Sequence, residues 1–383
     1  MIRNMHVCLV TVYPVRDDVV MGGVEAASLR LVDALQARGG VKITVVAPAA
    51  ASSIERRGDI DIHWTRSGPS LLPGILRYWS TERRSLQSAV RLVGADVVHF
   101  QATAGWGLGF DGPRVFQMHG VMEDAIMHSQ RWNRRISRWI LLAVEGRGRR
   151  SFPIVAVVGA HMVGRFGRQF TGDVVVAENT VPDSYFEIQR TPVSGRILFG
   201  GVVSNRKNTL GLLQAFAQVL ERAPDSELHI AGDLASFPAY ANECVQFAKQ
   251  RGIGSAVKFL GPISIDRMRS ELAEADVVVL PSFNESAPII ICEAMAAGVP
   301  VISSRRDGMV KMIDEGTTGY LIEPDNLDEL RDRILDLITN PDRNLAFGAA
   351  GRSSATGRFS SEALAATMVS CYQKAIDSAG SPL

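Results

Sequence analysis

The chain has 383 residues, of which 46% are hydrophobic and 21% charged, and its formal net charge is +1. This composition is typical of a globular protein with two substantial cores, excludes a disordered chain, and gives no charge excess from which to expect a nucleic-acid partner. The sequence also lacks a signal-peptide pattern and any apolar run of membrane-spanning length, and its scattered cysteines have no metal-like spacing, so we expect a cytoplasmic protein with reduced thiols at Cys8, Cys244, Cys292 and Cys371.

The two halves of the chain differ in charge. Residues 1–190 carry 23 Lys and Arg against 17 Asp and Glu, whereas residues 191–383 carry 18 against 23. The asymmetry indicates that the first half faces something anionic. The alternative is that the two charges differ without functional meaning.

The first predicted elements form a strand–helix–strand unit. A strand over 6–12 is followed by a loop, a helix over 24–36 and a strand over 42–47. Gly22 and Gly23 stand at the start of the helix, where glycine lets the backbone approach a ligand and leaves N–H groups for a phosphate. The pattern by itself is weak, because many loops contain two glycines.

Two further strands are predicted over 96–100 and 114–117. The segment 107–112 between them fits a dinucleotide-binding glycine pattern, but Pro113 and a strand follow it, so we interpret it as a surface loop. His119 ends the next strand. A histidine at the carboxyl end of a parallel strand is a candidate site residue, although a lone histidine is usually structural.

The segment 130–150 is basic and amphipathic. Apolar residues recur at helical spacing, at Trp132, Ile136, Trp139, Ile140 and Ala143. One acid, Glu145, stands among seven arginines: Arg131, Arg134, Arg135, Arg138, Arg147, Arg149 and Arg150. Two interpretations remain open. The apolar face packs on its own domain and the arginines are solvated, or the helix lies on an anionic membrane surface.

The first domain ends with strands over 154–158 and 173–177 and a short helix over 161–166. Residues 178–180 are predicted to form a structural turn. Residues 181–193 contain Pro182 and Pro192 and are expected to link two domains.

The second half opens with a strand over 196–201 and a loop that carries Arg206 and Lys207. The alternative for these two cations is ordinary surface charge. The remaining strands are predicted over 227–231, 257–260, 275–280, 299–303 and 319–322, and the helices over 209–221, 240–250, 265–273, 327–338 and 361–375.

The segment 281–300 is the most informative part of the chain. Ser286 is a candidate N-cap for a helix whose first turn contains Pro288 and which ends at Gly298. Glu285 lies in the loop, and Glu293 lies on a helix that is apolar nearly all round. A carboxylate buried there is costly unless it is hydrogen-bonded, which makes a functional role and a structural ion pair comparable alternatives.

The same segment reads Pro-Ser-x-x-Glu, then a second Glu eight residues later, then Ala-Met-Ala-x-Gly-x-Pro-Val. This pattern resembles the signature of the retaining glycosyltransferases of family 4, which have the GT-B fold. The resemblance implies that Glu293 holds the ribose of a nucleotide-sugar and that Glu285 contacts the sugar ring. It also implies that the backbone of Ser286, Ala287, Pro288 and Ile289 faces the sugar and phosphates.

The resemblance extends to four other positions. It implies that Gly22 and Gly23 face the diphosphate and that His119 points at the transferred sugar. The family has an Arg and, six residues later, a Lys that hold the diphosphate; Lys207 matches the Lys, but Gly201 stands at the Arg position. Arg206 is the candidate replacement.

The fold implied by the resemblance is two Rossmann-like doubly wound α/β domains that face each other across a cleft. We expect an acceptor-side domain over 1–187, joined by a helix over about 361–383, and a nucleotide-sugar domain over 192–360. The implied function is a retaining, metal-independent transferase of hexosyltransferase type, without a cofactor, that acts on a glycan or lipid-linked acceptor. Its implied place is the cytoplasm, either free or peripheral on the inner face of the membrane.

Two other classes of function remain open. Because Gly201 stands where the family has an arginine, a non-catalytic nucleotide-sugar-binding subunit is one alternative. A GT-B epimerase or phosphorylase is the other alternative, although no lysine is placed for a phosphorylase cofactor and the two glutamates favour transfer.

Overall fold

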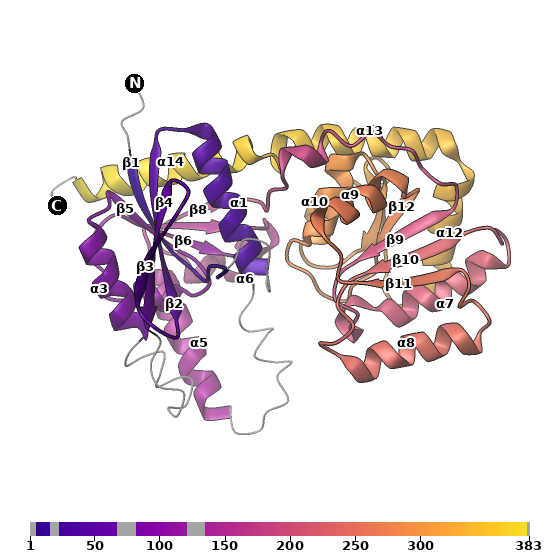
Figure 1. Ribbon diagram of the computed structural model, residues 1–383, viewed down its shortest axis with the longest axis horizontal. Coiled ribbons are helices and arrows are strands. Elements are labelled where there is room, and N and C mark those ends of the chain that lie inside the picture. Colours follow the sequence, from indigo (N-terminus) through magenta and orange to yellow (C-terminus); the bar gives the residue numbers. More distant parts are fainter. Residues whose placement is uncertain (1–4, 16–22, 67–81, 121–134, 381–383) are drawn as a thin grey trace. The chain divides into compact units, whose positions relative to one another are not determined.

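The computed structural model describes residues 5–15, 23–66, 82–120 and 135–380. The chain divides into two compact units (Figure 1). Unit 1 is Met1–Glu178 with Ser361–Leu383, and unit 2 is Asn179–Ser360. Each unit is a twisted sheet covered by helices on both faces, as parallel sheets require.

Unit 1 contains an eight-stranded sheet in the order β3-β4-β2-β1-β5-β6-β7-β8. Every neighbouring pair is parallel except β3 with β4. The central strand β1 pairs on both sides, so that Val7 lies opposite Ile43 and Val97. The strands are β1 (Met5–Val10), β2 (Val41–Ala49), β3 (Ser53–Arg57), β4 (Ile60–Arg66), β5 (Val97–Phe100), β6 (Arg114–Met118), β7 (Ile154–Val157) and β8 (Asp173–Val176).

Buried side chains cover both faces of this sheet, because successive residues of a strand point to opposite sides. Val7 and Leu9 of β1 join the core formed with α1 and α14, whereas on β5 Phe100 contacts Phe152 with ring centroids 5.6 Å apart. The helices of unit 1 are α1 (Gly23–Arg38), α3 (Arg83–Val93), α5 (Arg135–Arg150), α6 (His161–Phe166) and α14 (Ser361–Gly380), with 3-10 turns η2 (Ala104–Gly107) and η4 (Gly167–Gln169).

The C-terminal helix α14 is part of unit 1, although it begins 185 positions after the end of β8 (361 − 176). It buries one stripe at helical spacing, and Tyr372 Oη lies 2.8 Å from Nδ1 of the buried His99 on β5. The stripe consists of Leu364, Ala365, Met368, Cys371, Tyr372 and Ala375. Unit 1 therefore needs the end of the chain to complete its core.

Unit 2 contains a six-stranded, wholly parallel sheet in the order β11-β10-β9-β12-β13-β14. This order is that of a doubly wound dinucleotide-type fold, which reverses direction between β9 and β12. The strands are β9 (Arg196–Gly200), β10 (Glu227–Ala231), β11 (Val257–Gly261), β12 (Val277–Leu280), β13 (Val301–Ser304) and β14 (Gly319–Ile322).

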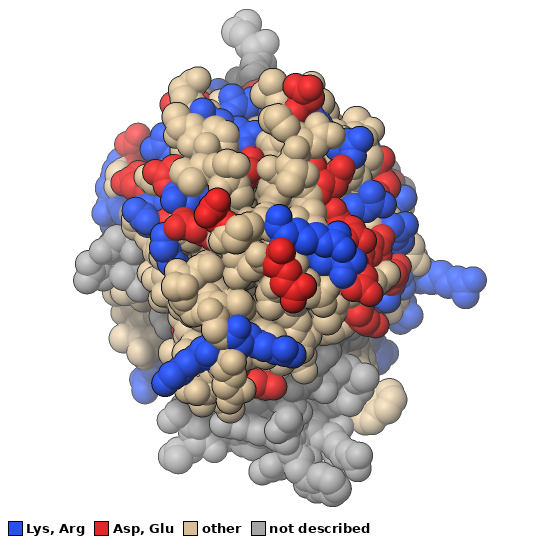
Figure 2. All heavy atoms as spheres, turned by 90° about the vertical axis from the view of Figure 1, so that its right-hand side faces the viewer, with Lys and Arg blue, Asp and Glu red and all other residues tan. Residues whose placement is uncertain are grey.

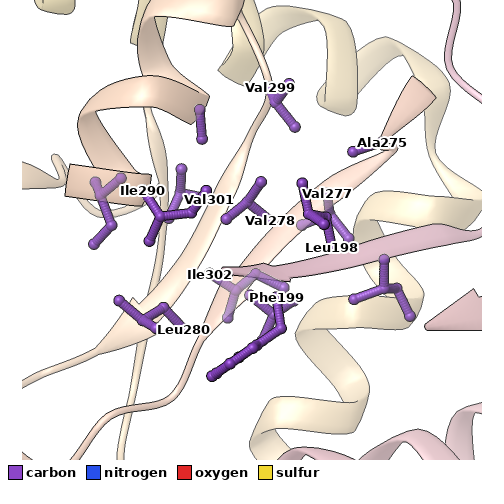
Figure 3. Packing of buried hydrophobic residues seen from close by; sticks show 14 of the residues in the cluster. Leu198, Phe199, Ala275, Val277, Val278, Leu280, Ile290, Val299, Val301 and Ile302 are labelled. Atoms are coloured by element: carbon purple, nitrogen blue, oxygen red, sulfur yellow. The ribbon is translucent and has the colours of Figure 1, made fainter. Parts of the chain in front are cut away.

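The core of unit 2 is built around β9, β12 and β13, all of whose hydrophobic residues are buried. Figure 3 shows Leu198 and Phe199 of β9 among side chains of β12, β13 and α10. The helices are α7 (Thr209–Leu220), α8 (Pro238–Gln250), α9 (Ile265–Glu274), α10 (Ile289–Ala297), α11 (Met309–Met312), α12 (Leu327–Thr339) and α13 (Pro341–Arg358), with 3-10 turns η5 (Asp183–Tyr185) and η6 (Asn205–Lys207).

The segment that was expected to link the domains belongs to unit 2. Val181, Tyr185 and Ile188 lie in its core, and the Val181 N–H donates to the Phe359 carbonyl at 2.9 Å. The chain consequently divides after Glu178 and not between 187 and 192, because burial of these apolar side chains outweighs the loop-like composition given by Pro182 and Pro192.

Acidic and basic side chains are interspersed on the face shown in Figure 2. Unit 2 contains ion pairs at its surface, among them Arg306 with Glu323 at 2.6 Å and Arg331 with Asp328 at 2.6 Å. Pairs of this kind contribute little to stability, since water screens them.

Candidate functional site

The strand order of unit 2 by itself predicts where a ligand site lies. Ligands of open α/β sheets bind beyond the carboxyl ends of the strands where the order reverses, which here means β9 and β12. The loop after β9 carries Arg206 and Lys207, and the loop after β12 carries Glu285. The fold therefore brings together residues that lie about 80 positions apart in sequence.

Glu285, Arg206 and Lys207 form one ion cluster. Arg206 Nη1 lies 2.6 Å from Glu285 Oε1, and Lys207 Nζ contacts the same oxygen. The side chains of Glu285 and Lys207 are only 12% and 10% exposed, whereas that of Arg206 is 43% exposed. Two cations thus share one carboxylate at a largely desolvated position, where their interaction is stronger than it would be in water.

Backbone hydrogen bonds hold the loops that carry the cluster. The Phe283 N–H donates to the Arg206 carbonyl at 2.9 Å, and Arg206 Nη1 donates to the Asn284 carbonyl at 2.8 Å. The Glu285 carbonyl accepts the Gly308 N–H at 3.0 Å from the loop after β13. The main chain on both sides of the cluster is therefore fixed.

The loop after β13 also contacts the cluster loop through a side chain. Asn284 Nδ2 donates to Asp307 Oδ2 at 2.6 Å, and Asp307 has a φ of +43°, which is uncommon for a residue other than glycine. The sequence interpretation did not include Asp307. No motif indicates it, because its partner comes from a different strand–helix unit.

Gly201, which stands at the Arg position of the family pattern, lies beside Lys207. Gly201 has a φ of +144°, and a Cβ placed on it would lie 3.1 Å from Cε and 3.3 Å from Nζ of Lys207. The lysine side chain therefore runs over the position that a side chain at residue 201 would need. Arg206 is the second cation of the cluster, and its replacement of the family arginine remains a prediction.

Helix α10 begins two residues later than the sequence suggests. Pro288, with a ψ of 123°, is the extended N-cap residue and Ile289 the first helical residue, so the prediction that Ser286 is the N-cap is wrong. Asn179 Nδ2 donates to the Ala287 carbonyl at 2.9 Å, which uses that carbonyl outside the helix. Asn179 was expected only to form a turn; instead, it fixes the loop before α10.

Glu293 lies in the second turn of α10 and is buried, with 7% of its surface exposed. It is the one charged residue in a helix of otherwise apolar side chains. Burial of a carboxylate is costly unless it has partners. The role of Glu293 as a ribose ligand remains a prediction.

Burial and charge act in opposite directions on Lys207. Its burial lowers the pKa of the ammonium group below the ordinary value, and the neighbouring Glu285 carboxylate partly opposes this decrease. Arg206 lowers the pKa of Lys207 further. A second anion at this position would raise the pKa of Lys207.

Two other predicted site residues lie in unit 1. Gly23 is exposed and begins α1, in the connection that follows β1, and Gly22 lies outside the described residues. His119 directly follows β6, and burial lowers the pKa of its imidazole to about 4. Its buried Nε2 has no hydrogen-bond partner within the part of the chain that the structure describes.

A buried polar network lies at the same edge of the unit 1 sheet. Gln101 Oε1 accepts hydrogen bonds from Thr11 Oγ1 at 3.0 Å and Ser28 Oγ at 2.7 Å, and Gln101 Nε2 donates to Gln117 Oε1 at 2.8 Å. The network ties α1 to β1, β5 and β6, and so fixes the elements from which Gly23 and His119 emerge. The sequence interpretation missed it because polar residues at strand ends carry no distinctive spacing.

The basic helix α5 packs in a different orientation from the one expected. Its buried face carries Glu145 and Arg149, and the face predicted to pack, with Trp139 73% and Ile140 45% exposed, lies in solvent. Residues 131–134 lie outside the described part. The interpretation that this apolar face packs on its own domain is therefore wrong for the described residues.

Specific partners hold the charged side chains on the buried face. Glu145 accepts hydrogen bonds from the Ala104 N–H at 3.1 Å and the Gly105 N–H at 3.3 Å, and also from Thr103 Oγ1. Arg149 lies over the Phe166 ring, 4.7 Å from its centroid, and donates to Gln169. Burial raises the pKa of Glu145.

Comparisons with known proteins assign the chain to a family. The family model described as glycosyl transferases group 1 matches residues 187–354, and the model described as glycosyltransferase family 4 matches residues 21–185. The chain belongs to the group 1, family 4 glycosyltransferases. The resemblance of residues 281–300 to this family is thereby confirmed.

Individual relatives of this glycosyltransferase are moderately similar. A D-inositol 3-phosphate glycosyltransferase of Corynebacterium kroppenstedtii is 32% identical over 183 residues, which cover 47% of this chain and 40% of the relative. That of Corynebacterium jeikeium is 31% identical over 188 residues, 48% of this chain and 44% of the relative. The aligned segments thus span less than half the length of these curated relatives.

Solved structures resemble the glycosyltransferase along almost its whole length. Sucrose-phosphate synthase from Thermosynechococcus elongatus is 20% identical with a TM-score of 0.80, covering 98% of this chain and all of that one. HepE of Anabaena in complex with UDP is 18% identical with a TM-score of 0.75, covering 97% and 100%. The predicted GT-B class, with two parallel-sheet α/β domains, is confirmed.

Within the described ranges, no helix combines the length and the apolar character needed to cross a bilayer.

Proposed function

We propose that this chain transfers a sugar, with retention of configuration and without a metal ion, from a nucleoside-diphosphate sugar to an acceptor hydroxyl. The cluster of Arg206, Lys207 and Glu285 at the reversal point of the unit 2 sheet carries the proposal. A diphosphate leaving group develops negative charge, and preorganised cations in a partly buried position stabilise it.

The comparisons support the donor class. HepE is solved with UDP and with UDP-glucose, and the curated relatives are named as glycosyltransferases. In this chain Glu293 would hold the ribose and Glu285 would contact the sugar. Loop backbone N–H groups before α10 would face the phosphates, since no side chain caps this helix in the described structure.

The proposed mechanism is attack of the acceptor on the same face from which the diphosphate leaves. The diphosphate would accept the acceptor proton, with Lys207 and Arg206 holding its charge. His119 would contribute as a neutral hydrogen-bonding group, because burial lowers its pKa to about 4.

Substitution of the two cations tests the proposal. Lys207→Ala should reduce turnover strongly, and Arg206→Ala should reduce it more than Arg222→Ala, a control at an arginine of unit 2 whose side chain is 63% exposed. Product analysis by NMR should show the donor's anomeric configuration, and a chelator should leave the rate unchanged. If Arg206→Ala behaves like the control, Arg206 does not replace the family arginine.

The same assays separate the alternatives. A non-catalytic subunit would bind nucleotide-sugars without transfer or hydrolysis, and Lys207→Ala would leave no activity to lose. An epimerase would convert the donor sugar in the absence of an acceptor. Transfer that requires an acceptor hydroxyl contradicts both.

We further propose that the acceptor is anionic or lipid-linked and that α5 docks the enzyme on an anionic membrane surface. Trp139, Ile140 and Ala143 are exposed beside the exposed Arg147 and Arg150, while Glu145, the acid of this helix, is buried on the opposite side. An exposed apolar strip flanked by arginines complements an anionic interface. The named acceptor of the curated relatives, an inositol phosphate, is also anionic.

Vesicle co-sedimentation tests the docking proposal. The protein should bind anionic vesicles at low salt, lose binding at high salt, and not bind neutral vesicles. A Trp139→Ser, Arg147→Ser, Arg150→Ser variant should lose binding, whereas Arg222→Ser, Arg251→Ser in unit 2 should retain most of it. No binding of the wild-type protein to anionic vesicles at low salt would leave a soluble acceptor.

A further inference from the structure

The ion cluster is already neutralised by a group of the protein itself. Glu285 Oε1 contacts both Arg206 Nη1, at 2.6 Å, and Lys207 Nζ, and its side chain is 12% exposed. A carboxylate oxygen that bridges two cations has the same charge as a phosphate oxygen and can pair with the same cations.

We infer that Glu285 is an internal stand-in for the donor diphosphate, and that the diphosphate must displace its carboxylate from Lys207 and Arg206 in order to bind. The inference rests on the proposed function and adds that the Glu285 carboxylate and the donor diphosphate compete for the same two cations. Lys207 and Arg206 would be the groups exchanged from one anion to the other.

The loop structure allows this exchange without a movement of the main chain. The Glu285 carbonyl is held by the Gly308 N–H at 3.0 Å, and the loop is joined to Arg206 by two hydrogen bonds that do not use the Glu285 side chain. Rotation of the Glu285 side chain is therefore sufficient. Its backbone remains in place while its carboxylate leaves the cations.

Lys207 stays in position during the exchange. Its side chain is only 10% exposed, so it has little room to follow the departing carboxylate. A charged lysine left without an anion in this position is unfavourable, so release of Glu285 and arrival of the diphosphate are coupled.

The coupling has a functional consequence. A carboxylate displaced from the cations becomes available to accept hydrogen bonds from hydroxyl groups of the donor sugar. Glu285 is therefore available to the sugar only when a diphosphate is bound. Free sugar would meet a Glu285 that is still paired.

Calorimetry with inorganic pyrophosphate and with UDP, GDP and ADP tests the inference on the full chain. Glu285→Gln removes the competing charge and should bind pyrophosphate and the accepted nucleoside diphosphate about tenfold more tightly than wild type, given the strength of charge-assisted hydrogen bonds. Its turnover with the nucleotide-sugar should fall. Glu323→Gln is the matched control, because it removes the same charge from an exposed ion pair of unit 2 with Arg306.

A structure of the wild-type protein with the accepted nucleoside diphosphate makes the test independent of the variant's folding. We expect the Glu285 carboxylate to have left Lys207 Nζ in that complex. Persistence of the contact, or equal affinities of wild type and a folded Glu285→Gln, overturns the inference while the proposed function stands. Failure of the wild-type protein to bind pyrophosphate or any of the three diphosphates overturns the proposed function as well.

Discussion

Single residues decide what the candidate site of unit 2 can bind. Glu293 is buried on a helix with an apolar surround, whereas Glu285 is paired with two cations at the loop. The two glutamates of the motif therefore have different environments and different expected roles. Substitution of each glutamate should weaken the binding of a different part of the donor.

Glu293→Gln keeps the size of the side chain and removes its charge. We expect donor affinity to fall by about 1–3 kcal/mol, because a hydrogen bond to a charged group is stronger than one to a neutral group. Calorimetry with the accepted nucleotide-sugar measures the change. Unchanged affinity in a folded variant would show that Glu293 does not contact the donor.

Gly201→Arg would restore the usual family residue at its position, but we expect it to reduce turnover. Residue 201 has a φ of +144°, and its side chain would displace Lys207. Gly252→Arg is the control, since Gly252 also has a positive φ, of +70°, but has no atom within 4 Å of the added Cβ. Both variants should lose about 1–3 kcal/mol of stability from backbone strain. A gain of turnover in Gly201→Arg would contradict the packing argument.

The lowered pKa of His119 predicts that the stability of the protein depends on pH. Its ordinary pKa of 6.5 is lowered by burial to about 4, so the unfolded chain binds the proton more readily than the folded one between these values. The stability that the neutral ring gives is present above about pH 6.5 and is lost as the pH falls toward 4. Urea unfolding of His119→Gln should show a smaller loss over this window than wild type. An identical loss would show that His119 does not titrate in this way.

At the scale of elements, packing decides how α5 is oriented. The sequence gives the helix two faces that could be buried, one apolar and one with Glu145 and Gly148. The structure buries the second, because Glu145 accepts hydrogen bonds from residues of η2 and Gly148 allows a close approach to the same turn. A satisfied buried carboxylate and a close helix–turn contact outweigh the apolar pattern.

Gly148→Ala tests this packing. The added Cβ would lie 2.6 Å from the carbonyl carbon of Ala104, which is backbone and cannot move aside easily. We expect a loss of about 1–3 kcal/mol in unfolding free energy, as for overpacked sites. Gly164→Ala in α6, with nothing within 4 Å of its Cβ, should be neutral or stabilising by about 0.5–1 kcal/mol. Equal effects at both glycines would contradict the orientation of α5.

At the scale of the whole molecule, the two units depend differently on the end of the chain. Unit 2 is continuous, from Asn179 to Ser360, whereas unit 1 needs Ser361–Leu383. The stripe on α14 that ends with Tyr372 and Ala375 is part of the unit 1 core. Loss of α14 would expose that core to water.

A chain that stops after Ser360 should therefore lose structure in unit 1 and keep it in unit 2. Amide hydrogen exchange resolves the two within one sample. We expect β1, β5 and β6 to lose protection while β9, β12 and β13 retain it. Retained protection of β1 would show that α14 is dispensable for unit 1.

The sequence alone determined the class of fold and the main residues of the candidate site. Short β-branched runs such as 277–280, which Pro281 follows, are sufficient to predict buried parallel strands, because both faces of such strands are covered. The motif with Glu285 and Glu293 and the position of Lys207 follow from local spacing, which the sequence records directly.

Only the tertiary structure decided the contacts between distant segments. Two of these contacts join residues that are far apart in the chain: the pairing of Arg206 and Lys207 with Glu285, and the hydrogen bond from Asn179 to the loop before α10. A third, the position of the Lys207 side chain beside Gly201, depends on backbone conformation. The boundary after Glu178 and the inward orientation of Glu145 were decided by burial against partners from other elements. Periodicity shows which face of a helix is apolar, but the partner available to each face determines which one is buried.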